Sequence, residues 1–204
     1  MENAPVLQLA PPPACLKLDL GAGQNPREGF EGVDLWPKST HVVDLMKFPW
    51  PWGNNSVEEL HCSHFVEHIP AREVTYADMH HIVPTDGEAF LGQDMLLAFF
   101  DECWRILKPD GWMTCITPAL QSVRAFQDPT HRRFIPAETY LYLSAEWRQA
   151  NKLDHYRVEC NFGVDINPTI PQELSLLHQE AQARRVREGW NCTYDFHAKL
   201  KALK

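Results

Sequence analysis

Hydrophobic and polar positions change their period several times along the chain and divide it into strand-like and helix-like segments. Short apolar runs, which are typical of buried strands, cover residues 16–20, 30–35, 41–44, 59–63, 112–117 and 156–164. Residues 192–200 alternate strictly, with one face made of Cys192, Tyr194, Phe196, Ala198 and Leu200. This alternation predicts a strand with its other face open to water, at or near a sheet edge.

Two segments repeat apolar residues every three or four positions and therefore predict helices. The first covers residues 94–111 and is expected to end at Pro109. The second covers residues 171–189, between Pro171 and Gly189. Because strands and helices alternate, the pattern predicts an α/β fold, a mostly parallel sheet with helices on its faces.

The composition indicates one soluble domain of 204 residues, with 44% hydrophobic and 23% charged residues. No apolar run approaches the ~18 residues of a membrane helix, and the amino terminus lacks a basic region before an apolar one. The six cysteines contain no C-x-x-C pair, which favours reduced, buried thiols in a cytoplasmic protein. The formal net charge of -8 argues against nucleic acid as the main partner.

The stretch LKLDLGAGQNP, residues 16–26, places a Gly-x-Gly turn directly after the first predicted strand. The dinucleotide fingerprint requires a third glycine, an amphipathic helix and an acid about 20 residues further on. Here Pro26 occupies the third glycine position, and Asp34 follows only thirteen residues after Gly21. The intervening QNPREG is long enough for about one helical turn, whereas a pyrophosphate depends on the N-terminus of a proper helix. The sequence therefore argues against a nicotinamide or flavin cofactor.

Two acids near the glycines suit a ligand that has a ribose and a cationic group but no phosphate. Asp19 precedes the first glycine by two residues and is placed to meet a positive amino group or its water. Asp34 is placed to accept both ribose hydroxyls, and hydrogen bonds to a charged acceptor contribute roughly 1.5–3 kcal/mol each when sheltered. Adenosine joined to methionine has these features. The alternative is that Asp34 only stabilises a turn.

Four ordered motifs carry a family resemblance: LDLGAG, GVDL, VVDLMKFPWPWGNNSVEELHCSHFVEHI and ECWRILKPDGW. In order and spacing they resemble the motifs of class I S-adenosylmethionine-dependent methyltransferases, over about residues 16–117, half of the chain. The resemblance implies a Rossmann-like, doubly wound sheet of seven strands in the order 3-2-1-4-5-7-6, with strand 7 antiparallel. It also implies S-adenosylmethionine as cofactor and a single methyltransferase domain over residues 1–204.

Carried over by position, the resemblance implies that the glycine turn holds the methionine part of the cofactor and that Asp34 holds its ribose. The acid that follows the third strand would meet the adenine edge, and the end of the fourth strand would line the floor beside the methyl group. The expected cofactor-binding residues are Asp19, Gly21, Ala22, Gly23, Asp34, Leu35, Asp44, Leu45 and Ser63. Asp44 has an alternative role, which is to cap the following turn.

An insertion at about residues 70–95 departs from many members of this family, which pass almost directly into the next helix. An insertion beside the site is typical of a substrate lid. A passive surface elaboration is the equal alternative. Within it, His80 and His81 are interpreted as surface residues.

The string HFVEH, residues 64–68, also matches the H-x-x-E-H zinc motif of inverted metalloproteases, with Glu67 as base. Two observations argue against zinc. The same string fits the ordinary end of the fourth methyltransferase strand, and Pro70 leaves no room for a helix that presents both histidines. We therefore expect no metal site, and a zinc hydrolase ranks last among the functions considered.

The loop after the fifth strand is where an acceptor is expected, because such loops border the ligand crevice. His131 is the candidate base, since its unperturbed pKa of ~6.5 suits proton removal near neutrality. His64, at the end of the fourth strand, is the second candidate catalytic residue. Arg132 and Arg133 are candidates for holding an anionic group of the substrate. The alternative is a loop fixed by an Asp–Arg pair, without a catalytic part.

The acceptor is expected to be a small or sugar-linked molecule. The chain has SHFV where amino-methylating DNA enzymes carry D/N-P-P-Y, and it has no Pro-Cys pair for attack on cytosine. The sequence thus predicts a methyltransferase for such an acceptor. The alternative function is a non-catalytic module of the same fold that binds the cofactor or a partner, because fold alone does not establish turnover.

Overall fold

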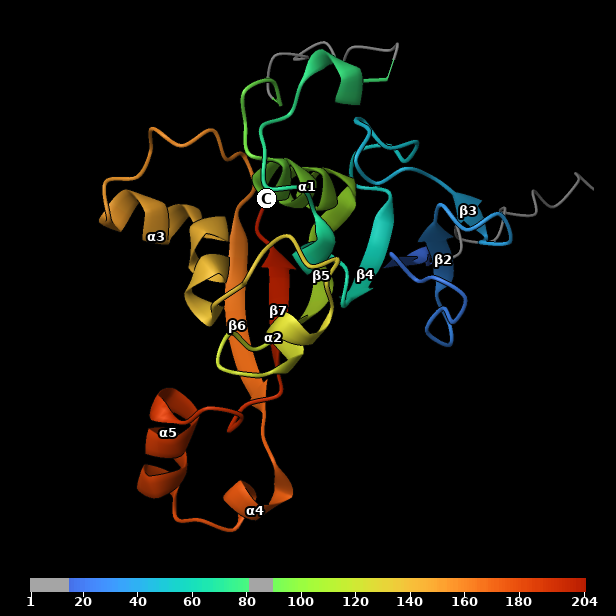
Figure 1. Ribbon diagram of the computed structural model, residues 1–204. Coiled ribbons are helices and arrows are strands. Elements are labelled where there is room, and N and C mark those ends of the chain that lie inside the picture. Colours follow the sequence, from blue (N-terminus) through green and yellow to red (C-terminus); the bar gives the residue numbers. More distant parts are fainter. Residues whose placement is uncertain (1–14, 81–89) are drawn as a thin grey trace, which may run out of the picture.

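The computed structural model describes residues 15–80 and 90–204, and a seven-stranded sheet forms its centre (Figure 1). The strands lie in the order β3-β2-β1-β4-β5-β7-β6, and β7 runs antiparallel to both of its neighbours. Their bounds are Lys17–Leu20 (β1), Glu31–Asp34 (β2), His41–Val42 (β3), Val57–Ser63 (β4), Leu107–Pro118 (β5), Phe162–Thr169 (β6) and Asp195–Ala202 (β7). This order and the direction of β7 confirm the predicted Rossmann-like α/β fold.

The register of the parallel strands brings their carboxyl ends to one edge of the sheet. Leu20, the last residue of β1, pairs with Val33 of β2 and with Cys62 of β4. Asp34 and Ser63 therefore lie on either side of the glycine turn that follows β1. The order of the strands reverses at β1, and open α/β sheets bind ligands at such a point.

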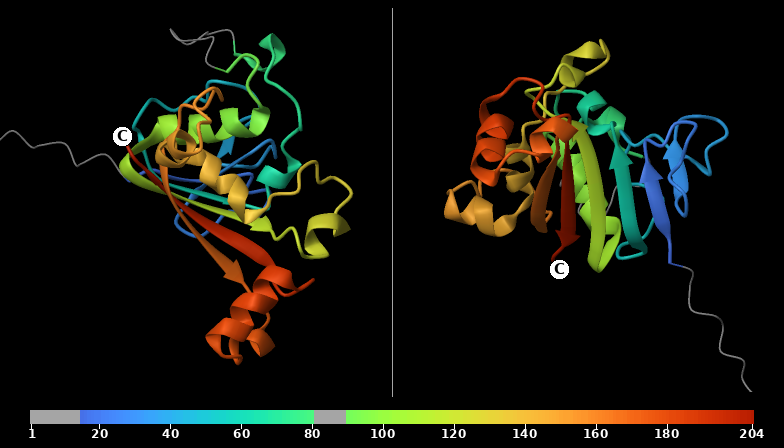
Figure 2. Two further views of the ribbon diagram at one scale, coloured as in Figure 1. Left: turned by 90° about the vertical axis from the view of Figure 1, so that its left-hand side faces the viewer. Right: turned by 90° about the horizontal axis from the view of Figure 1, so that it is seen from below.

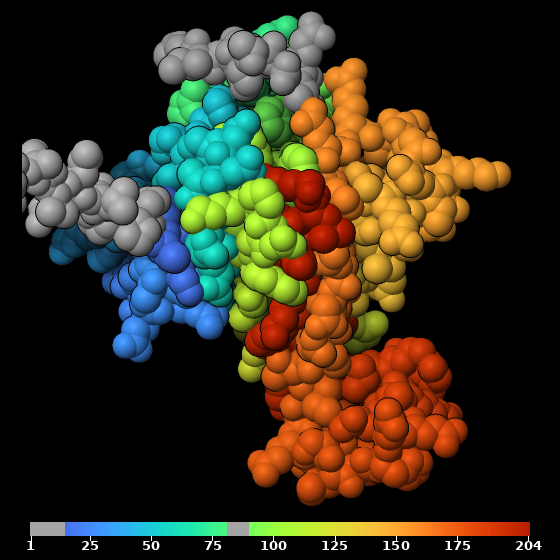
Figure 3. All heavy atoms as spheres, turned by 180° about the vertical axis from the view of Figure 1, so that it is seen from behind, coloured from blue at the N-terminus to red at the C-terminus, as the bar shows by residue number. Residues whose placement is uncertain are grey.

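The two faces of the sheet are covered unequally. The helix α1 (Met95–Ile106), together with η3 (Ala137–Leu143) and α3 (Ala145–Ala150), lies over one face. Seen from behind, the strands β5, β7 and β6 themselves form the surface (Figure 3). Trp112, which is 47% exposed, and the exposed Lys199 belong to this second face. The predicted alternation holds at the end of β7, where Ala198 and Leu200 are buried and Lys199 is exposed, but it was wrong for Thr193 and Asp195, which are buried. Helices on both faces of the sheet were expected.

Turns replace the short first helix between β1 and β2. Residues 21–30 contain no helical residue. The ring of Phe30 lies edge-on to His61, with 6.0 Å between ring centroids, and the guanidinium of Arg27 lies 5.3 Å from the centre of the Phe30 ring. These contacts place the loop over β1 and β4, where a helix was expected to begin.

The helix α1 is shorter than the predicted segment of residues 94–111. The side chain of Asp94 accepts a hydrogen bond from the first turn, and the helix ends at Ile106. Leu107 is already extended, because it pairs with Val57 in the sheet. The prediction was therefore wrong for the last turn, which belongs to β5.

The strand predicted over residues 156–164 begins later, at Phe162. Two buried charged side chains satisfy the backbone before it: the carboxylate of Asp101 accepts from the N–H of Cys160 (2.8 Å), and Arg148 donates to the carbonyl of Cys160 (2.9 Å). Because this backbone bonds to side chains, it takes no strand partner. The start of the strand was predicted wrongly for this reason.

The single helix predicted over residues 171–189 is two helices, α4 (Gln172–Ser175) and α5 (Gln179–Glu188). The side chain of His178 caps the start of α5, and Leu176 at the break is 82% exposed. No residue of either helix is buried. The two helices project from the sheet beyond the ends of β6 and β7 (Figure 1 and Figure 2). Without a core beneath them, apolar periodicity does not hold the segment in one helix.

The described part of the insertion is pinned to the core. Asp78, at the end of the short helix η2 (Tyr76–Asp78), pairs with Arg72 at 2.6 Å, and its carbonyl accepts from the N–H of Phe48 at 2.8 Å. Phe48 is fully buried. His81 and the rest of residues 81–89 lie outside the described residues, and the prediction of a lid rests on them.

Within residues 15–80 and 90–204, we find no helix that is both long and apolar enough to cross a bilayer.

Candidate functional site

Two hollows lie at the carboxyl edge of the sheet. The first, which we call the β2–β3 crevice, has a volume of ≈ 120 Å³, and its lining includes Asp34, Leu35, Val43, Asp44, Leu45 and Phe65. The second, which we call the histidine pocket, has a volume of ≈ 480 Å³, and its lining includes His64, His68, Arg124, Gln127, Asp128 and His131. His64 and Phe65 are consecutive, so the chain that leaves β4 contributes to both.

The glycine turn is held against β2 and leaves one side open. The N–H groups of Gly21 and Ala22 both donate to the carbonyl of Val33, at 2.8 and 3.3 Å. Gly21 has φ 70° and Gly23 has φ 55°, conformations that favour glycine. A Cβ atom on Gly21 would lie 2.3 Å from the Phe65 ring, whereas one on Gly23 would meet nothing within 4 Å. Packing thus requires the first glycine, and the second faces open space.

Asp34 joins the glycine turn to the end of β2. Its Oδ2 accepts from the N–H of Gly23 and its Oδ1 from the N–H of Trp36, both at 2.9 Å. Each carboxylate oxygen keeps further lone-pair capacity, so these bonds do not prevent it from accepting ligand hydroxyls. Leu35 beside it is 62% exposed at the rim of the crevice. The predicted turn role and the predicted ligand role of Asp34 are therefore compatible.

The crevice continues to the segment after β3. Asp44 caps the following turn, because its Oδ1 accepts from the N–H of Met46 at 2.9 Å. Leu45 is buried, and its carbonyl accepts from the indole N–H of Trp50 at 3.3 Å. The alternative role of Asp44 as a cap is thus present, and Leu45 is part of the core as well as of the crevice wall.

Asp19 is buried and engaged within the protein. Its Oδ1 lies 2.8 Å from Nδ1 of His61, and its Oδ2 accepts from the N–H of Arg27 at 2.8 Å. Both oxygens therefore hold the loop that follows the glycine turn. The hydrogen bond to His61 offsets the free-energy cost of burying this carboxylate.

His64 follows the half-buried Ser63 and carries backbone strain. Its φ is 54°, an uncommon value for a non-glycine residue, and its N–H donates to the carbonyl of Ile116 at 2.9 Å. Its Nδ1 lies 3.3 Å from Oε1 of Glu67, and its Nε2 lies 3.9 Å from Oδ1 of Asp195. Hydrogen bonding to the Glu67 carboxylate raises the pKa of His64 above its ordinary value, against the opposing effect of burial.

Glu67, His68 and His131 meet at the base of the histidine pocket, each with one possible ligand atom, and these atoms lie within 4.8 Å of one another. Nε2 of His131 is 4.0 Å from Oε1 of Glu67. The two imidazole rings stand edge to face, with 4.8 Å between centroids. His131 is a candidate from the sequence, whereas His68 and Glu67 entered only as part of the zinc motif.

The loop after β5 is fastened to the segment after β4. The N–H groups of Arg132 and Arg133 donate to the carbonyl of Glu67, at 2.7 and 3.0 Å. The guanidinium of Arg133 donates to the carbonyls of Ile69 and Pro70, and it also pairs with a carboxylate at the start of α1. Nε and Nη2 of Arg133 are thus engaged inside the protein, and the role of both arginines in holding substrate stays a prediction.

The pocket contains a different arginine from those predicted. Arg124, in the short helix α2 (Arg124–Gln127), lines the pocket and pairs with Asp195 of β7 at 2.8 Å. Tyr140 lies in the core with its hydroxyl 3.1 Å from that of Thr117, so it does not reach the pocket. No sequence pattern points to Arg124, because its position depends on the ion pair with β7.

The objection to a zinc helix at residues 64–68 is confirmed. Only residues Val66–His68 are helical, as the 3-10 turn η1, and Ile69 returns to an extended conformation. The two histidines of the motif therefore do not share a helical face. The structure instead groups His68 with a histidine from another segment.

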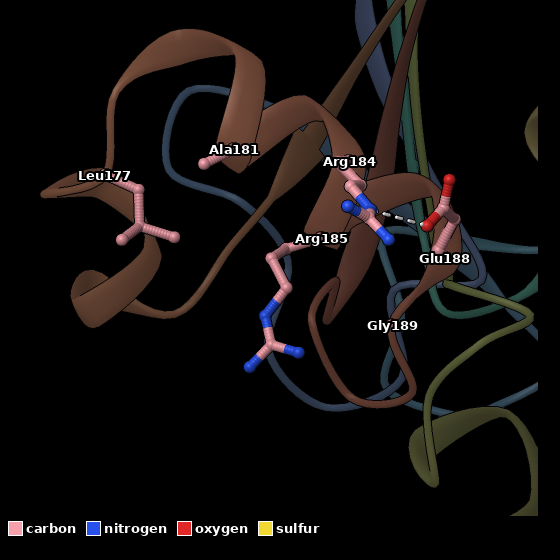
Figure 4. A pocket seen from close by; sticks show the side chains of 6 residues that line it. All are labelled: Leu177, Ala181, Arg184, Arg185, Glu188 and Gly189. Atoms are coloured by element: carbon pink, nitrogen blue, oxygen red, sulfur yellow. Dashed lines mark hydrogen bonds and ion pairs between the residues drawn. The ribbon is translucent and has the colours of Figure 1, made fainter.

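A further hollow lies on α5, away from the sheet (Figure 4). Its lining includes Leu177, Arg184, Arg185 and Glu188. Arg184 pairs with Glu188 at 3.0 Å, but their side chains are 76% and 50% exposed. A surface pair of this kind contributes little and marks no site.

The sequence comparisons place the chain in no established group: no protein-family model matches it, and no curated protein is close enough in sequence to count as a relative. Solved structures do match its fold. A SAM-dependent methyltransferase from Archaeoglobus fulgidus is 18% identical, with a TM-score of 0.54 over 92% of this chain and 86% of that one. The geranyl diphosphate C-methyltransferase of Streptomyces coelicolor A3(2), solved with Mg²⁺, geranyl diphosphate and S-adenosyl-L-homocysteine, is 14% identical, with a TM-score of 0.51 over 94% of this chain and 73% of that one. Together with the strand order, these matches show that the chain has the fold of the class I S-adenosylmethionine-dependent methyltransferases.

Proposed function

We propose that this protein is an S-adenosylmethionine-dependent methyltransferase that acts on a small-molecule or sugar-linked acceptor. The observation that carries the proposal is the position of Asp34. Its carboxylate lies at the end of β2, bonded to the N–H of Gly23 at the point where the strand order reverses. A carboxylate at this point is suited to the two hydroxyls of a ribose.

The turns after β1 support a ligand without a phosphate. A pyrophosphate is stabilised by the N-terminus of a helix, and residues 21–30 form none. The open space beside Gly23 and the partly apolar crevice past Leu35 are available instead. The crevice, at ≈ 120 Å³, suits one planar base rather than a whole nucleotide, and the rest of the cofactor would follow the turn.

In this proposal, Asp34 and Leu35 bind the nucleoside, Asp44 and Leu45 the base, and Gly21, Ala22 and Gly23 the methionine part. Asp19 positions the turn from behind. When bound, S-adenosylmethionine supplies an electrophilic methyl group: a lone pair of the acceptor forms the new bond to this carbon, the electrons of the broken S–C bond stay on sulfur, and the acceptor loses its proton.

The histidine pocket is the proposed acceptor site. Ser63 and His64 lie between the glycine turn and this pocket, so an acceptor there faces the methyl group. Nδ1 of His131 donates to the carbonyl of Ala125 at 2.8 Å, which leaves Nε2 with a lone pair to receive a proton. Arg124 and Asp128 at the pocket wall offer polar contacts to a small acceptor. We therefore propose His131 and His64 as the residues that handle the acceptor proton.

We place the protein in the cytoplasm. Four free thiols are buried: Cys62, Cys103, Cys115 and Cys160. Burial raises the pKa of the Cys62, Cys103 and Cys160 thiols. Buried reduced cysteines are typical of a reducing compartment.

Isothermal titration with S-adenosylmethionine, S-adenosylhomocysteine and NAD tests the cofactor. We expect both methionine derivatives to bind and NAD to give no heat. Asp34→Ala should weaken binding about 100-fold while the protein stays folded, and Asp165→Ala, an exposed acid on β6, should leave it unchanged. NAD binding without S-adenosylmethionine binding would overturn the proposal. Transfer of a labelled methyl group to a panel of small hydroxyl and amino acceptors then tests catalysis, and cofactor binding without any transfer would favour the non-catalytic module.

A further inference from the structure

We propose that Glu67, His68 and His131 form a binding site for one divalent transition-metal ion at the base of the histidine pocket. The binding site stands on its own geometry. Only its role in catalysis rests on the proposed methyltransferase function.

The first argument is the state of Glu67. Its side chain is 2% exposed, and among the described residues neither carboxylate oxygen has a hydrogen-bond partner. Its nearest cationic group is the imidazole of His64 at 3.3 Å, which is itself 45% exposed. A buried carboxylate without hydrogen bonds is unfavourable unless it is paired or binds a metal. The half-exposed imidazole of His64 is thus the main partner of this buried carboxylate, and a bound cation would stabilise its charge further.

The second argument is the orientation of the two imidazole rings. Nδ1 of His131 bonds to the carbonyl of Ala125 (2.8 Å), which can only accept, so this nitrogen carries the hydrogen. Nδ1 of His68 lies 3.1 Å from Oγ1 of Thr130, whose own hydrogen is directed to the carboxylate of Asp128 at 2.7 Å. Thr130 therefore accepts from His68. In both rings the Nε2 atom is left with its lone pair.

This arrangement is the one that metal-binding histidines adopt. A ligating imidazole donates its other N–H to a carbonyl or to an outer polar group, which fixes both the tautomer and the ring orientation. Here Ala125 serves His131, and the Thr130–Asp128 pair serves His68. The outer contacts are formed without a metal, so the tautomers of both rings are already set.

The third argument is that the two segments which supply the ligands are fastened together. The N–H groups of Arg132 and Arg133, the two residues after His131, donate to the carbonyl of Glu67. The guanidinium of Arg133 holds the carbonyls of Ile69 and Pro70, next to His68. Hydrogen bonds on both sides of the cluster therefore limit how far the ligand atoms can move apart.

The distances suit a metal ion after a small adjustment. Ligand atoms that share one ion at ~2.0–2.2 Å lie roughly 3–4 Å apart. Nε2 of His131 and Oε1 of Glu67 are 4.0 Å apart, and all three ligand atoms lie within 4.8 Å. Two imidazoles and one carboxylate are ligands that zinc, iron, cobalt or nickel accept, whereas magnesium prefers oxygen.

The open side of the site faces the histidine pocket, so the remaining positions on the ion are available to an acceptor hydroxyl. A bound cation would lower the pKa of such a hydroxyl, and the proton that it loses would pass to solvent. With metal bound, Nε2 of His131 is a ligand rather than the proton acceptor. The metal thus replaces the general-base role proposed above for this histidine.

Cobalt binding tests the site directly. The full chain is freed of metal with a chelator and titrated with Co²⁺, and binding is followed by visible absorption and by titration calorimetry. We expect one Co²⁺ per chain, displaced by Zn²⁺ but not by the same concentration of Mg²⁺. Glu67→Gln and His131→Gln should each weaken Co²⁺ binding at least roughly 100-fold. Thr130→Val removes the hydroxyl that contacts His68 and Asp128 but no ligand atom, and it should weaken binding roughly 10-fold.

His155→Ala, which removes an exposed histidine outside the pocket, is the matched control and should bind Co²⁺ like the unchanged protein. Circular dichroism shows whether each variant is folded, and Thr130→Val keeps the test decisive should a ligand variant unfold. Absence of Co²⁺ binding, or equal binding by all four variants, would overturn the proposal. Binding of S-adenosylmethionine is measured on the same samples. Cofactor binding without Co²⁺ binding contradicts the metal site alone, and Co²⁺ binding without cofactor binding contradicts the proposed function alone.

Discussion

The β2–β3 crevice and the histidine pocket lie at the same edge of one sheet, but they are built in different ways. Sequence neighbours build most of the crevice: apart from Phe65, its lining comes from residues 34–46, at the end of β2 and after β3. The pocket joins the end of β4 to a distant loop, in which Thr130 contacts His68 from 62 residues further along the chain. The sequence alone therefore predicts the first region, and only the fold assembles the second.

The largest expected effect is that of Gly21→Ala, because Gly21 packs under Phe65, the residue that stands between the two regions. The new Cβ would lie 2.3 Å from the Phe65 ring, at a backbone φ of 70°. Strain and overpacking together should lower the free energy of unfolding by about 3 kcal/mol, and they should weaken both cofactor and Co²⁺ binding. Urea unfolding measures the first effect, and titration calorimetry the second.

Gly23→Ala separates the two causes. Gly23 also has a positive φ, but a Cβ atom there would meet no described residue within 4 Å. The substitution should therefore cost only about 1 kcal/mol of stability. It should still weaken cofactor binding, because Gly23 faces the open side of the turn. Adding Phe65→Ala to Gly21→Ala should relieve the clash with the ring and leave only the 2.9 Å contact with the Cβ atom of residue 65. Equal destabilisation by the two glycine variants would show that Phe65 does not matter.

The next effect in size concerns the independence of the two regions. Asp34→Ala removes a charged acceptor of two hydrogen bonds and should weaken S-adenosylmethionine binding by about 100-fold, or about 3 kcal/mol. Glu67→Gln should leave that affinity within a factor of about two, since the two carboxylates share no partner among the residues described here. Calorimetry on the single and double variants checks this. A change in binding free energy for the double variant that differs from the sum for the two single variants would show that the two regions act as one site.

Most of the fold was predictable because its signals are local. Apolar runs at residues 16–20 and 59–63 mark β1 and β4, and the alternation at residues 192–200 marks β7. The misplaced boundaries have a common cause, which is tertiary contact. Asp101 and Arg148 occupy the backbone before β6, and the pairing of Leu107 draws the end of α1 into β5.

The candidate site was predictable only where one residue and its sequence neighbours decide the chemistry. Asp34 and Gly23 were found because a Gly-x-Gly turn and a strand end have fixed geometry. The pairing of His131 with His68, and the burial of Glu67, depend on how two loops are fastened together. The H-x-x-E-H string marks the segment that contains Glu67 and His68. Whether this segment is helical does not decide whether it binds a metal, because the third ligand comes from the loop after β5.

A smaller effect is expected from acid, at the Arg72–Asp78 pair of the insertion. The guanidinium of Arg72 holds the pKa of Asp78 well below its usual value, so the stability from this carboxylate is present above its ordinary pKa of ~3.9 and is lost as pH falls below it. At pH 7, Asp78→Asn should lower the free energy of unfolding by about 1–2 kcal/mol. The difference from the unchanged protein should shrink towards pH 3, as urea unfolding at each pH will show.

Asp154→Asn is the control for this experiment, because Asp154 is exposed. It should have the same stability as the unchanged protein at every pH. The other carboxyl groups titrate in all three proteins and cancel in the comparison. A difference between Asp78→Asn and the unchanged protein that stays constant from pH 7 to pH 3 would show that the Arg72 pair does not depend on the charge of Asp78.

The smallest effect belongs to α5, which lies outside both regions and serves as the reference for the comparison. His178 accepts from the N–H of Ala181 through its imidazole, at 3.3 Å, and removal of a helix cap costs about 0.5–2 kcal/mol. Because no residue of α4 or α5 is buried, His178→Ala should melt this helix locally without changing the global unfolding transition. Hydrogen exchange should therefore rise over residues 179–188 alone, while the affinities for S-adenosylmethionine and Co²⁺ stay the same. A change in either affinity would mean that the projecting helices contribute to the site. The comparison between the crevice and the histidine pocket would then have to include α4 and α5 as a third region.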